Sequence, residues 1–590
     1  MKKLIYFYCF VVVLTILVGV YFISAFSQGL AYPPIKSDGE GYYAYLPTLL
    51  IHKTIDFRVL EKTHFQGGAY DWAGISLNTS TGMLMNRYPI GVAVLMSPFF
   101  LVAHILTKIT KLFSADGYSL IYQCSVLVSA LFYYLIGTYF LFKSLLKHFS
   151  ERIALVTILF ITFGTSLFHY ITFDAVFSHV YSFCFVSILI YLTERFWTRA
   201  SYLSAILLGA SIGFLFLIRN YNLIYAIYFL LHPLNKSRYI GIFLKNYFLV
   251  MGKFITVLLV AFIIVSPQLF IWKITTGKFI AYSYGDYGFN WSHPQIFNVL
   301  FSLDNGLFIY SPTLLFAVLG LIIGFKETQD KELNNIAVTS LFIILLLIYI
   351  ISSWRIWNFG ASYGHRGFVD AYPFFAFGLA IAIRDCYTSW SRVLIYTVLI
   401  TSTIVTSIHM YNYWLGKIPF ETPTAYIQAL KSFPKRVYVG LFVPDYKKST
   451  NINSGLKALV SDVSDKKIPN AAKPSQSIDV KYSILNTGES YWLDAHTLLV
   501  GGKVSLGVLW FPQLEKGKGC RRQLEAIDGT RIPLAGIVAP GERVYLHGSI
   551  QVPKVPGQYT MLIEMVSEGV AWFKDVSNSS VACYDIAVKK

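Results

Sequence analysis

Two carboxylates stand close together near the start of the chain, in the stretch KSDGEGYY. Asp38 and Glu40 are separated by one glycine and followed by another, just after an apolar run. Acids in a loop are commonly only solvated, but glycines also allow the backbone to approach a ligand closely. A carboxylate held beside a ligand can act as a general base and take the proton from an attacking hydroxyl. Alternatively, the pair can ligate a divalent cation.

Basic residues gather in a second stretch, WRIWNFGASYGHR, which covers residues 354–366. Arg355, His365 and Arg366 can form an aromatic and basic anchor at a membrane interface, or they can bind a phosphate. The phosphate interpretation rests on the forked guanidinium group, which grips phosphate through two parallel hydrogen bonds. Arg219, in FLIRNYN, is a lone cation after an apolar run. It either extends to the interface or makes a second phosphate contact.

Other polar candidates lie beside apolar runs. Asp174 and His179 occur in HYITFDAVFSHVYSF, where a histidine near the end of a run is most often a hydrogen-bonded structural group. Arg87 directly precedes the apolar YPIG stretch, which begins with Tyr88, and both residues are site candidates. The chain contains no G-x-G-x-x-G motif after a strand, no G-x-x-x-x-G-K-[ST] and no H-E-x-x-H, so the sequence gives no support for a nucleotide site.

The elements that position these residues are those of a membrane protein. The chain has 590 residues, of which 55% are hydrophobic and 14% charged, and its mean hydropathy is +0.55. Soluble domains carry about 25% charged residues. The net charge of +18 fits cytoplasmic loops rich in Lys and Arg, so we expect no nucleic-acid partner.

Apolar runs predict about eleven membrane spans. The first, from Leu4 to Phe26, is long enough to span and is interpreted as a retained helix rather than a cleaved signal peptide. The others lie near 118–142, 153–171, 176–193, 202–218, 221–232, 249–272, 306–325, 336–352, 367–383 and 391–413. Placing the basic loops in the cytoplasm puts the candidate site residues and the C-terminus on the outer side.

One apolar segment does not fit this alternation. Residues 88–107 contain Pro89, Gly91 and Pro98, and counting them as a span would place the next basic loop on the wrong side. We therefore expect a juxtamembrane helix inside a long outer loop, 27–117.

The composition changes after about residue 414. Residues 1–415 are expected to form the helical domain and residues 416–475 a polar linker. In residues 476–590, short alternating segments separated by turn residues predict a small β-sandwich domain. Cys520 and Cys583 lie there, and an oxidising compartment would allow them to pair.

Residues 1 to about 415 resemble the GT-C superfamily of membrane glycosyltransferases, in the group that includes protein O-mannosyltransferases and lipid A aminoarabinose transferases. The likeness rests on the acidic motif after the first span, the YPIG segment, the later outer acid and the GASYGHR motif. It implies a polytopic α-helical GT-C fold, and the β domain resembles Ig-like modules of bacterial surface enzymes. Within the family pattern, Asp38 matches the first-loop acid, Asp174 the outer acid and Arg366 the closing arginine.

The resemblance also implies a reaction. The donor is a sugar on a polyprenyl phosphate, the acceptor is a glycan, lipid or protein, and inverting transfer takes place on the outer side of what we expect to be a bacterial inner membrane. Membrane lipids are the other partners. Because the leaving group is already a phosphate, a divalent cation on Asp38 and Glu40 is optional. Protein mannosyltransferases carry an adjacent Asp-Glu pair, whereas Gly39 separates the acids here, so the identity of the base stays open.

Two other functions fit a polytopic chain. A transporter or flippase of lipid-linked glycans would more often show an internal repeat of spans and charged groups deep within helices. The sequence suggests neither. A membrane scaffold that presents the β domain would leave the clustering of outer arginines and acids without a reason.

Overall fold

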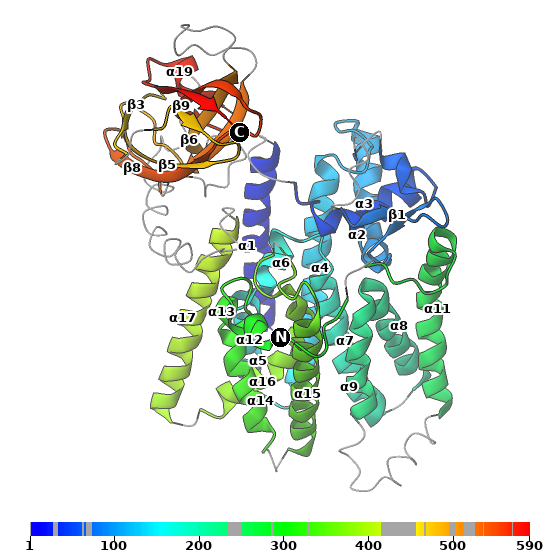
Figure 1. Cartoon of the computed structure of the whole chain (residues 1–590). Coiled ribbons are helices and arrows are strands. Elements are labelled where there is room, and N and C mark those ends of the chain that lie inside the picture. The colour runs from blue at the N-terminus through cyan, green and yellow to red at the C-terminus, as the bar shows by residue number, and fades with distance from the viewer. Residues whose placement is uncertain are drawn as a thin grey trace. The chain divides into compact units, whose positions relative to one another are not determined.

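The computed structural model describes residues 2–27, 33–61, 64–65, 73–199, 201–232, 251–284, 288–326, 330–360, 362–386, 388–414, 456–464, 468–494, 503–512, 526–534, 536–568 and 570–589. The chain folds as two compact units, which we describe separately. A helical unit contains the described residues up to 413, and a β unit contains those from 456 (Figure 1).

The helical unit consists of helices of very different lengths. They are α1 (Lys2–Ser27), α2 (Asp38–Leu46), α3 (Gly91–Thr110), α4 (Leu120–Leu145), α5 (Glu151–Phe163), α6 (Leu167–Thr172), α7 (His179–Thr198), α8 (Tyr202–Ile218), α9 (Ala226–Leu231), α11 (Met251–Thr276), α12 (Ile296–Phe301), α13 (Leu307–Tyr310), α14 (Thr313–Gly324), α15 (Lys331–Ser353), α16 (Tyr372–Arg384) and α17 (Ser389–Trp414). Tighter or wider turns form η1 (Pro47–Ile51), η2 (Phe57–Leu60), η5 (Asn220–Tyr225) and η7 (Arg366–Ala371), and β1 (Ile75–Leu77) pairs with β2 (Leu84–Asn86).

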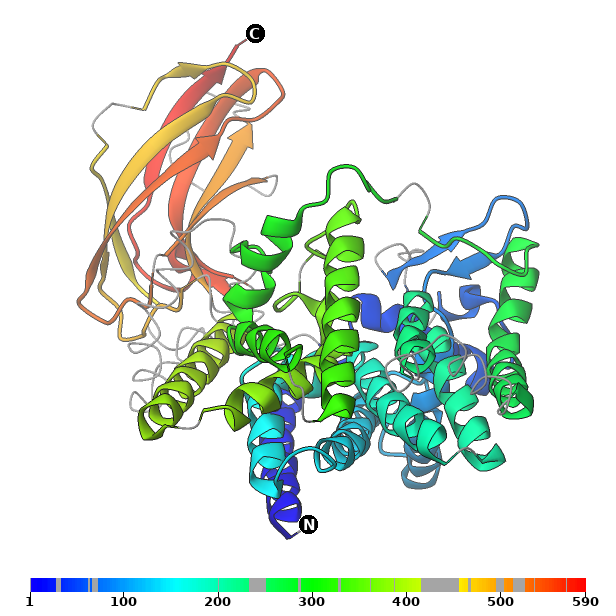
Figure 2. The ribbon, with the colours of Figure 1, turned by 90° about the horizontal axis from the view of Figure 1, so that it is seen from below.

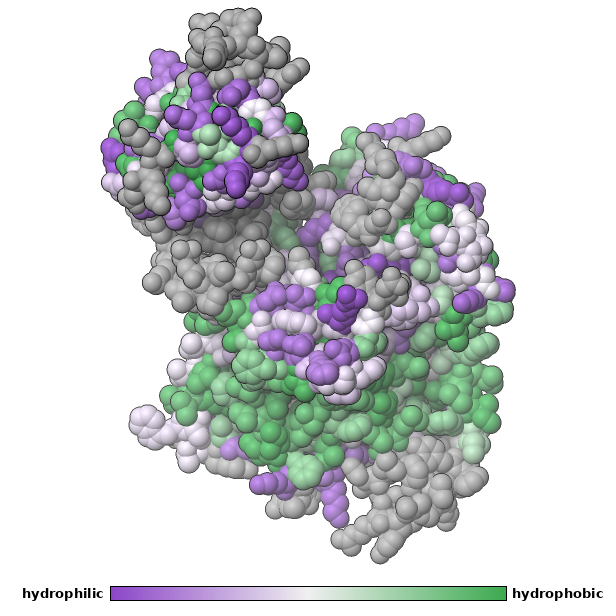
Figure 3. Space-filling view, in the orientation of Figure 1, coloured by the Kyte–Doolittle hydropathy of each residue, from purple (hydrophilic) through white to green (hydrophobic). Residues whose placement is uncertain are grey.

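Within the described residues, eight helical stretches are long and apolar enough to cross a membrane, by length and composition. They are Lys2–Ile23, Gly91–Thr110, Leu120–Leu145, His179–Thr198, Met251–Thr276, Lys331–Ser353, Arg366–Arg384 and Trp390–Tyr411. Two shorter apolar helices are Tyr202–Ile218 and Thr313–Gly324. Figure 3 shows a broad apolar band across the helical unit, with hydrophilic residues gathered above and below it.

The expected class is confirmed in its coarse form, because a helical unit with candidate spans precedes a β unit. Three expected spans are not single long helices, and one of them, the run at 306–325, divides into α13 and α14. The run at 153–171 divides into α5 and α6, since Gly164 ends α5 as its C-cap. The run at 221–232 forms η5 and the short helix α9. The GT-C type, the total number of spans and their sidedness stay predictions.

The segment expected to be interrupted by proline forms one continuous helix, α3, which qualifies as a candidate span by length and composition. Pro98 lacks an N–H and would leave the carbonyl of Val94 unpaired. The hydroxyl of Ser97 donates to that carbonyl at 2.8 Å. Ser266 does the same for Ile263 at 2.8 Å, beside Pro267 in α11. A serine before each proline therefore preserves the helix in an apolar environment. The juxtamembrane placement of α3 stays a prediction.

Small residues allow α14 and α16 to cross closely. A Cβ atom at Gly378 would lie 2.0 Å from the Ala317 carbonyl oxygen, and one at Gly320 would lie 1.8 Å from the Gly378 oxygen. Such contacts between backbones supply the packing that apolar attraction cannot supply between helices in lipid. This crossing fixes α16, and the N-terminal end of α16 follows η7, which carries Arg366.

The β unit contains two sheets that share one core. One sheet has the order β3 (Ala458–Asp462), β5 (Ser477–Asn486), β8 (Arg543–Gln551). The other has the order β4 (Ala471–Ala472), β11 (Ala582–Val588), β9 (Gly557–Ser567), β6 (Val504–Pro512), β7 (Ile527–Pro533), and β10 (Ala571–Trp572) pairs with β9. Only β4 and β11 pair in parallel among these described strands. Figure 2 shows the long strands of the unit side by side.

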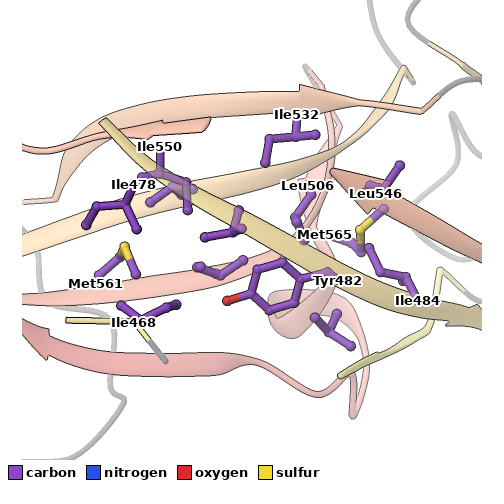
Figure 4. Packing of buried hydrophobic residues seen from close by; sticks show 14 of the residues in the cluster. Ile468, Ile478, Tyr482, Ile484, Leu506, Ile532, Leu546, Ile550, Met561 and Met565 are labelled. Carbon is purple, nitrogen blue, oxygen red and sulfur yellow. The ribbon is translucent and has the colours of Figure 1, made fainter. Parts of the chain in front are cut away.

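The core lies between the two sheets. Tyr482 and Ile484 from β5 and Leu546 from β8 belong to the same buried cluster as Leu506 from β6 and Met565 from β9 (Figure 4). Alternate residues of β5 are buried over most of its length, as expected for a strand with one face on a core. The predicted β-sandwich is thus present as two sheets that pack on one hydrophobic core.

The β unit begins within the stretch expected as a linker. β3 and β4 both lie before residue 476, yet they belong to the β unit, because β3 pairs with β5 and β4 pairs with β11. Cys583 is disulfide-bonded, and its expected partner, Cys520, lies outside the described residues. The four free cysteines described are Cys9, Cys124, Cys184 and Cys386.

Candidate active site

Asp38 is the first residue of a short, tightly packed helix rather than part of an open loop. Every residue of α2 after Asp38 is buried. A Cβ atom at Gly39 would lie 1.9 Å from a methyl group of Val176, and one at Gly41 would lie 2.3 Å from the Ala73 carbonyl oxygen. The two glycines were expected to admit a ligand. The structure gives them a different function, which is to let α2 pack against its neighbours.

The acid and the arginine singled out in the sequence form a direct ion pair. Arg366 Nη1 lies 2.8 Å from Asp38 Oδ2, and the two side chains are 13% and 28% exposed. The other terminal nitrogen of Arg366 donates to the carbonyl oxygen of Phe359 at 2.7 Å. Its guanidinium also lies 5.4 Å from the ring centroid of Phe177. Arg366 is therefore held in place on three sides and presents a fixed cation to Asp38.

Burial raises the pKa of Asp38, but Arg366 and a hydrogen bond with Tyr88 outweigh burial and hold that pKa below its ordinary value. An acid whose pKa is lowered on folding contributes stability above its unfolded pKa of about 3.9, and that contribution is lost as pH falls through the folded value. We therefore expect the difference in melting temperature between wild type and Asp38→Asn to be constant from pH 7 to about pH 5. It should shrink below about pH 4, as measured by thermal unfolding in detergent. A difference that grows on acidification would contradict this ion pair.

Arg219 and His179 lie together around a buried carboxylate that sequence reasoning missed. His179 Nδ1 is 2.9 Å from Asp370 Oδ1, and Arg219 Nη1 is 3.7 Å from Asp370 Oδ2. Arg219 also lies 3.2 Å from His179 Nδ1. The Nδ1 atom of His179 cannot donate to Asp370 and accept from Arg219 at once. The contact with Asp370 is the shorter one, so we assign Nδ1–H as the donor to the Asp370 carboxylate. Tyr221 donates to the second oxygen of Asp370 at 3.2 Å.

Tyr284 connects the two ion pairs and Arg87. Burial raises the pKa of this phenol, Asp38 raises it further, and Arg219, Arg87 and Arg366 act in the opposite direction. The guanidinium of Arg87 lies 5.4 Å from the Tyr284 ring centroid. The Arg87 guanidinium is thus within cation–π distance of the ring, and Asp38, Arg219 and Arg366 also influence the pKa of its hydroxyl.

We call Asp38, Arg87, Arg219, Arg366 and Asp370 the charged cluster. It contains three guanidinium groups and two carboxylates, so cations outnumber anions. The Nε of Arg87 is buried and has no hydrogen-bond partner among the described residues. A buried donor without an acceptor is costly, and an excess of buried positive charge favours binding of an anion. Phosphate, with several acceptor oxygens, fits both features.

Asp174 lies outside the charged cluster, in a third ion pair, with a lysine that the sequence analysis does not single out. Lys36 Nζ is 3.3 Å from Asp174 Oδ1, and His169 Nε2 is 2.8 Å from Asp174 Oδ2. The ammonium also lies 3.4 Å from the ring centroid of Phe173. Burial raises the pKa of Asp174, but Lys36 and His169 outweigh it and leave that pKa lowered.

Lys36 fixes the chain where α2 begins. Its carbonyl oxygen accepts from the N–H of Gly39 at 3.0 Å. The intervening Ser37 has a φ of 53°, a left-handed conformation that persists in a non-glycine residue only when the surroundings enforce it. The ion pair with Asp174 thus holds the turn that places Asp38.

Lys36→Met is expected to lower the free energy of unfolding by about 2–4 kcal/mol, because it leaves Asp174 buried without its cation. The double variant Lys36→Met/Asp174→Asn should recover part of that loss. Thermal unfolding of both single variants and the double variant measures the coupling between the two side chains. Strictly additive losses would contradict a stabilising pair.

Glu40 faces the opposite side of α2 from Asp38. Residues two apart on a helix do not face each other. Glu40 Oε2 lies 3.6 Å from His64 Nε2, and the His64 ring stacks on Tyr118 at 3.6 Å between centroids. The described residues contain no group of three or more potential metal ligands. The interpretation of Asp38 and Glu40 as one cation site is therefore not supported by their geometry.

Two residues expected to bind phosphate do not join the charged cluster. Arg355 is exposed, and its backbone N–H donates to the carbonyl oxygen of Gly288. His365 is 2% exposed, and burial lowers its pKa to about 3, with Arg366 acting in the same direction. A histidine that is neutral at working pH offers no positive charge to a phosphate. Tyr88, by contrast, is hydrogen-bonded to Asp38.

Comparison with known proteins finds no family for this chain. No protein-family model matches it, and no curated protein matches it. Among solved structures, Pseudomonas fluorescens alkylpurine DNA glycosylase AlkC bound to DNA containing an abasic site analog aligns at 10% sequence identity, over 84% of this chain and 99% of that chain. The TM-score is 0.15, which is too low to imply a shared fold or function.

Proposed function

We propose that this chain is a membrane glycosyltransferase that moves a sugar from a polyprenyl-phosphate donor to an acceptor on the extracytoplasmic side of the membrane. The observation that carries the proposal is the 2.8 Å pair between Asp38 and Arg366 within a buried cluster of excess positive charge. A transferase of this kind needs a carboxylate base and cations for a phosphate leaving group, side by side. The candidate spans supply apolar surface for a lipid tail.

In the protein without substrate, the Asp38 carboxylate is engaged in the ion pair with the Arg366 guanidinium. A donor phosphate would compete for the same guanidinium and free the carboxylate to act as a base. The acceptor oxygen would then attack the anomeric carbon of the sugar, and its proton would pass to Asp38. The bond between that carbon and the phosphate oxygen breaks, and the electron pair leaves with the phosphate. Attack from the side opposite the leaving group inverts the configuration of the sugar.

The arginines stabilise the charge that develops on the departing phosphate. Arg366 and Arg219 are both mostly buried, at 13% and 12% exposed. Fixed cations in a poorly hydrated site stabilise a developing negative charge more strongly than water does. Asp370 holds Arg219 and His179 in position and does not itself need to meet the substrate. No step in this scheme requires a metal ion.

The proposal is tested by purifying the full chain, reconstituting it in vesicles and supplying radiolabelled polyprenyl-phosphate hexoses and pentoses with a cell-envelope extract as acceptor. We expect transfer of label from lipid to acceptor, with loss of the free hydroxyl that is glycosylated. Movement of an intact lipid-linked sugar across the vesicle, without transfer, would indicate a transporter instead.

A further inference from the structure

A row of aromatic side chains leads from the charged cluster to the surface. We call Tyr284, Trp354, Phe289 and Trp291 the aromatic row. The ring centroids of Tyr284 and Trp354 are 5.5 Å apart, those of Trp354 and Phe289 are 4.9 Å apart, and those of Phe289 and Trp291 are 4.6 Å apart. The first ring, Tyr284, lies 5.4 Å from the guanidinium of Arg87 in the charged cluster.

The row is held rigidly at the C-terminal end of α15. Phe289 forms an antiparallel bridge with Trp354, and the N–H of Asn290 donates to the Ser353 carbonyl oxygen at 2.6 Å. The hydroxyl of Tyr349, one turn earlier on α15, donates to the carbonyl oxygen of Trp291 at 3.0 Å. Rings fixed in this way lose little conformational freedom when a ligand stacks on them.

The outer end of the row is open. Phe289 is 42% exposed and Trp291 is 47% exposed, and their rings are nearly parallel, at 10°. Exposed residues with hydrogen-bonding side chains flank them, namely Asn290, Ser292 and His293. Exposed aromatic faces beside hydrogen-bonding groups are typical of a binding surface.

A sugar ring matches this surface chemically. One face of a pyranose presents C–H groups with partial positive charge, which are attracted to the negative face of an aromatic ring. Its rim carries hydroxyls, which pair with side-chain donors and acceptors. A saturated lipid tail can contact the rings but has no group that can hydrogen-bond the exposed polar side chains beside them.

We propose that the aromatic row binds the acceptor, and that the acceptor is a carbohydrate chain. Sugar units contact the exposed parts of the Trp291 and Phe289 rings, and the acceptor end of the chain extends past Trp354 toward the charged cluster. This inference rests on the proposed function and deepens it, because it selects a glycan among the glycan, lipid and protein acceptors. Neighbouring rings pack against one another with centroids 4.6–5.5 Å apart, so the row is continuous from its exposed end to Tyr284.

The competing explanation is that these aromatic residues anchor the protein at the membrane interface, where Trp and Tyr are common. The continuity of the row with the charged cluster, through the contact between Tyr284 and Arg87, favours the glycan, since an anchor has no need of contact with a charged site. Both explanations are addressed by the same variants.

The test uses the full chain in lipid nanodiscs and three linear hexasaccharides of glucose, N-acetylglucosamine and mannose, without donor. Trp291→Ala and Phe289→Ala are each expected to weaken binding of at least one hexasaccharide about tenfold or more. The matched control is Trp390→Ala, because Trp390 is 85% exposed at the start of α17 and outside the row; it should leave the Kd unchanged. With donor present, the same row variants should raise the acceptor KM and leave the donor KM unchanged.

The outcomes separate the two proposals. If row variants lose hexasaccharide binding and no donor supports transfer, the glycan site stands and the transferase proposal fails. If transfer occurs but the row variants bind and turn over acceptor like wild type, the glycan site is wrong. It is also wrong if wild type binds none of the three sugars. The fluorescence of Trp291 is obtained by subtracting the signal of Trp291→Ala from that of wild type. If brominated lipids quench this fluorescence and the row variants bind sugar like wild type, the row belongs to the membrane interface.

Discussion

Asp38→Asn is expected to lower kcat for sugar transfer by about 10³-fold and to leave the donor KM within a few-fold of wild type. Asparagine keeps the size of the side chain and still accepts a hydrogen bond, but it cannot take a proton from the acceptor. Initial rates with a labelled polyprenyl-phosphate sugar measure both constants. Thermal unfolding at pH 7 checks that the variant folds.

Glu40→Gln is the matched control for the base. Glu40 lies two residues away on the same helix, but it faces His64 rather than Arg366. We expect less than a tenfold change in kcat for this variant. A large loss in Glu40→Gln combined with near-normal activity in Asp38→Asn would reverse the assignment and place the chemistry on the other side of α2.

Arg366→Lys should lower kcat/KM by about 10²–10³-fold. Most of this loss is expected to come from weaker stabilisation of the departing phosphate in the transition state. Lysine retains the charge that faces Asp38, yet it loses the fork that can hold a phosphate and the Phe359 carbonyl oxygen together. The ratio of kcat/KM between wild type and variant gives the lost transition-state stabilisation directly.

Arg355→Lys supplies the comparison, because Arg355 belongs to the same sequence motif but is exposed. Its kcat/KM should stay within about twofold of wild type when a short soluble acceptor is used. Equal losses in Arg355→Lys and Arg366→Lys would mean that the motif binds phosphate as a unit, contrary to the geometry around Asp38.

The sequence identified the acid, the arginine and Tyr88 that the fold brings together, because each stands beside an apolar run at a place where polar residues are costly. Asp370 was not predicted, because it lies just inside the run 367–383, which its length and hydropathy mark only as a membrane span. The signal was present, since a lone carboxylate next to an apolar helix is retained only with partners. Lys36 carries no comparable signal, because a single lysine outside an apolar run is most often exposed to solvent.

The orientation of Glu40 was beyond sequence reasoning. The stretch DGEGYY contains two glycines and has a weak intrinsic preference for helix, so it was interpreted as a loop in which both acids could face one ligand. Packing against Val176 and Ala73 makes it helical instead, and a helix separates the two acids. In the β unit, alternation predicted the long strands, but β3 and β4 are too short for a pattern to develop.

The tight packing of α2 fixes the orientation of this helix about its own axis, and so fixes the direction in which each side chain points. Each residue advances a helix by about 100°, so inserting one residue between Ser37 and Asp38 would turn both carboxylates away from their present partners. The glycines would turn with them, out of the two places where no side chain fits. Any related chain that keeps this site must therefore preserve the distance from the lysine to the second glycine, whatever the length of the loop before it.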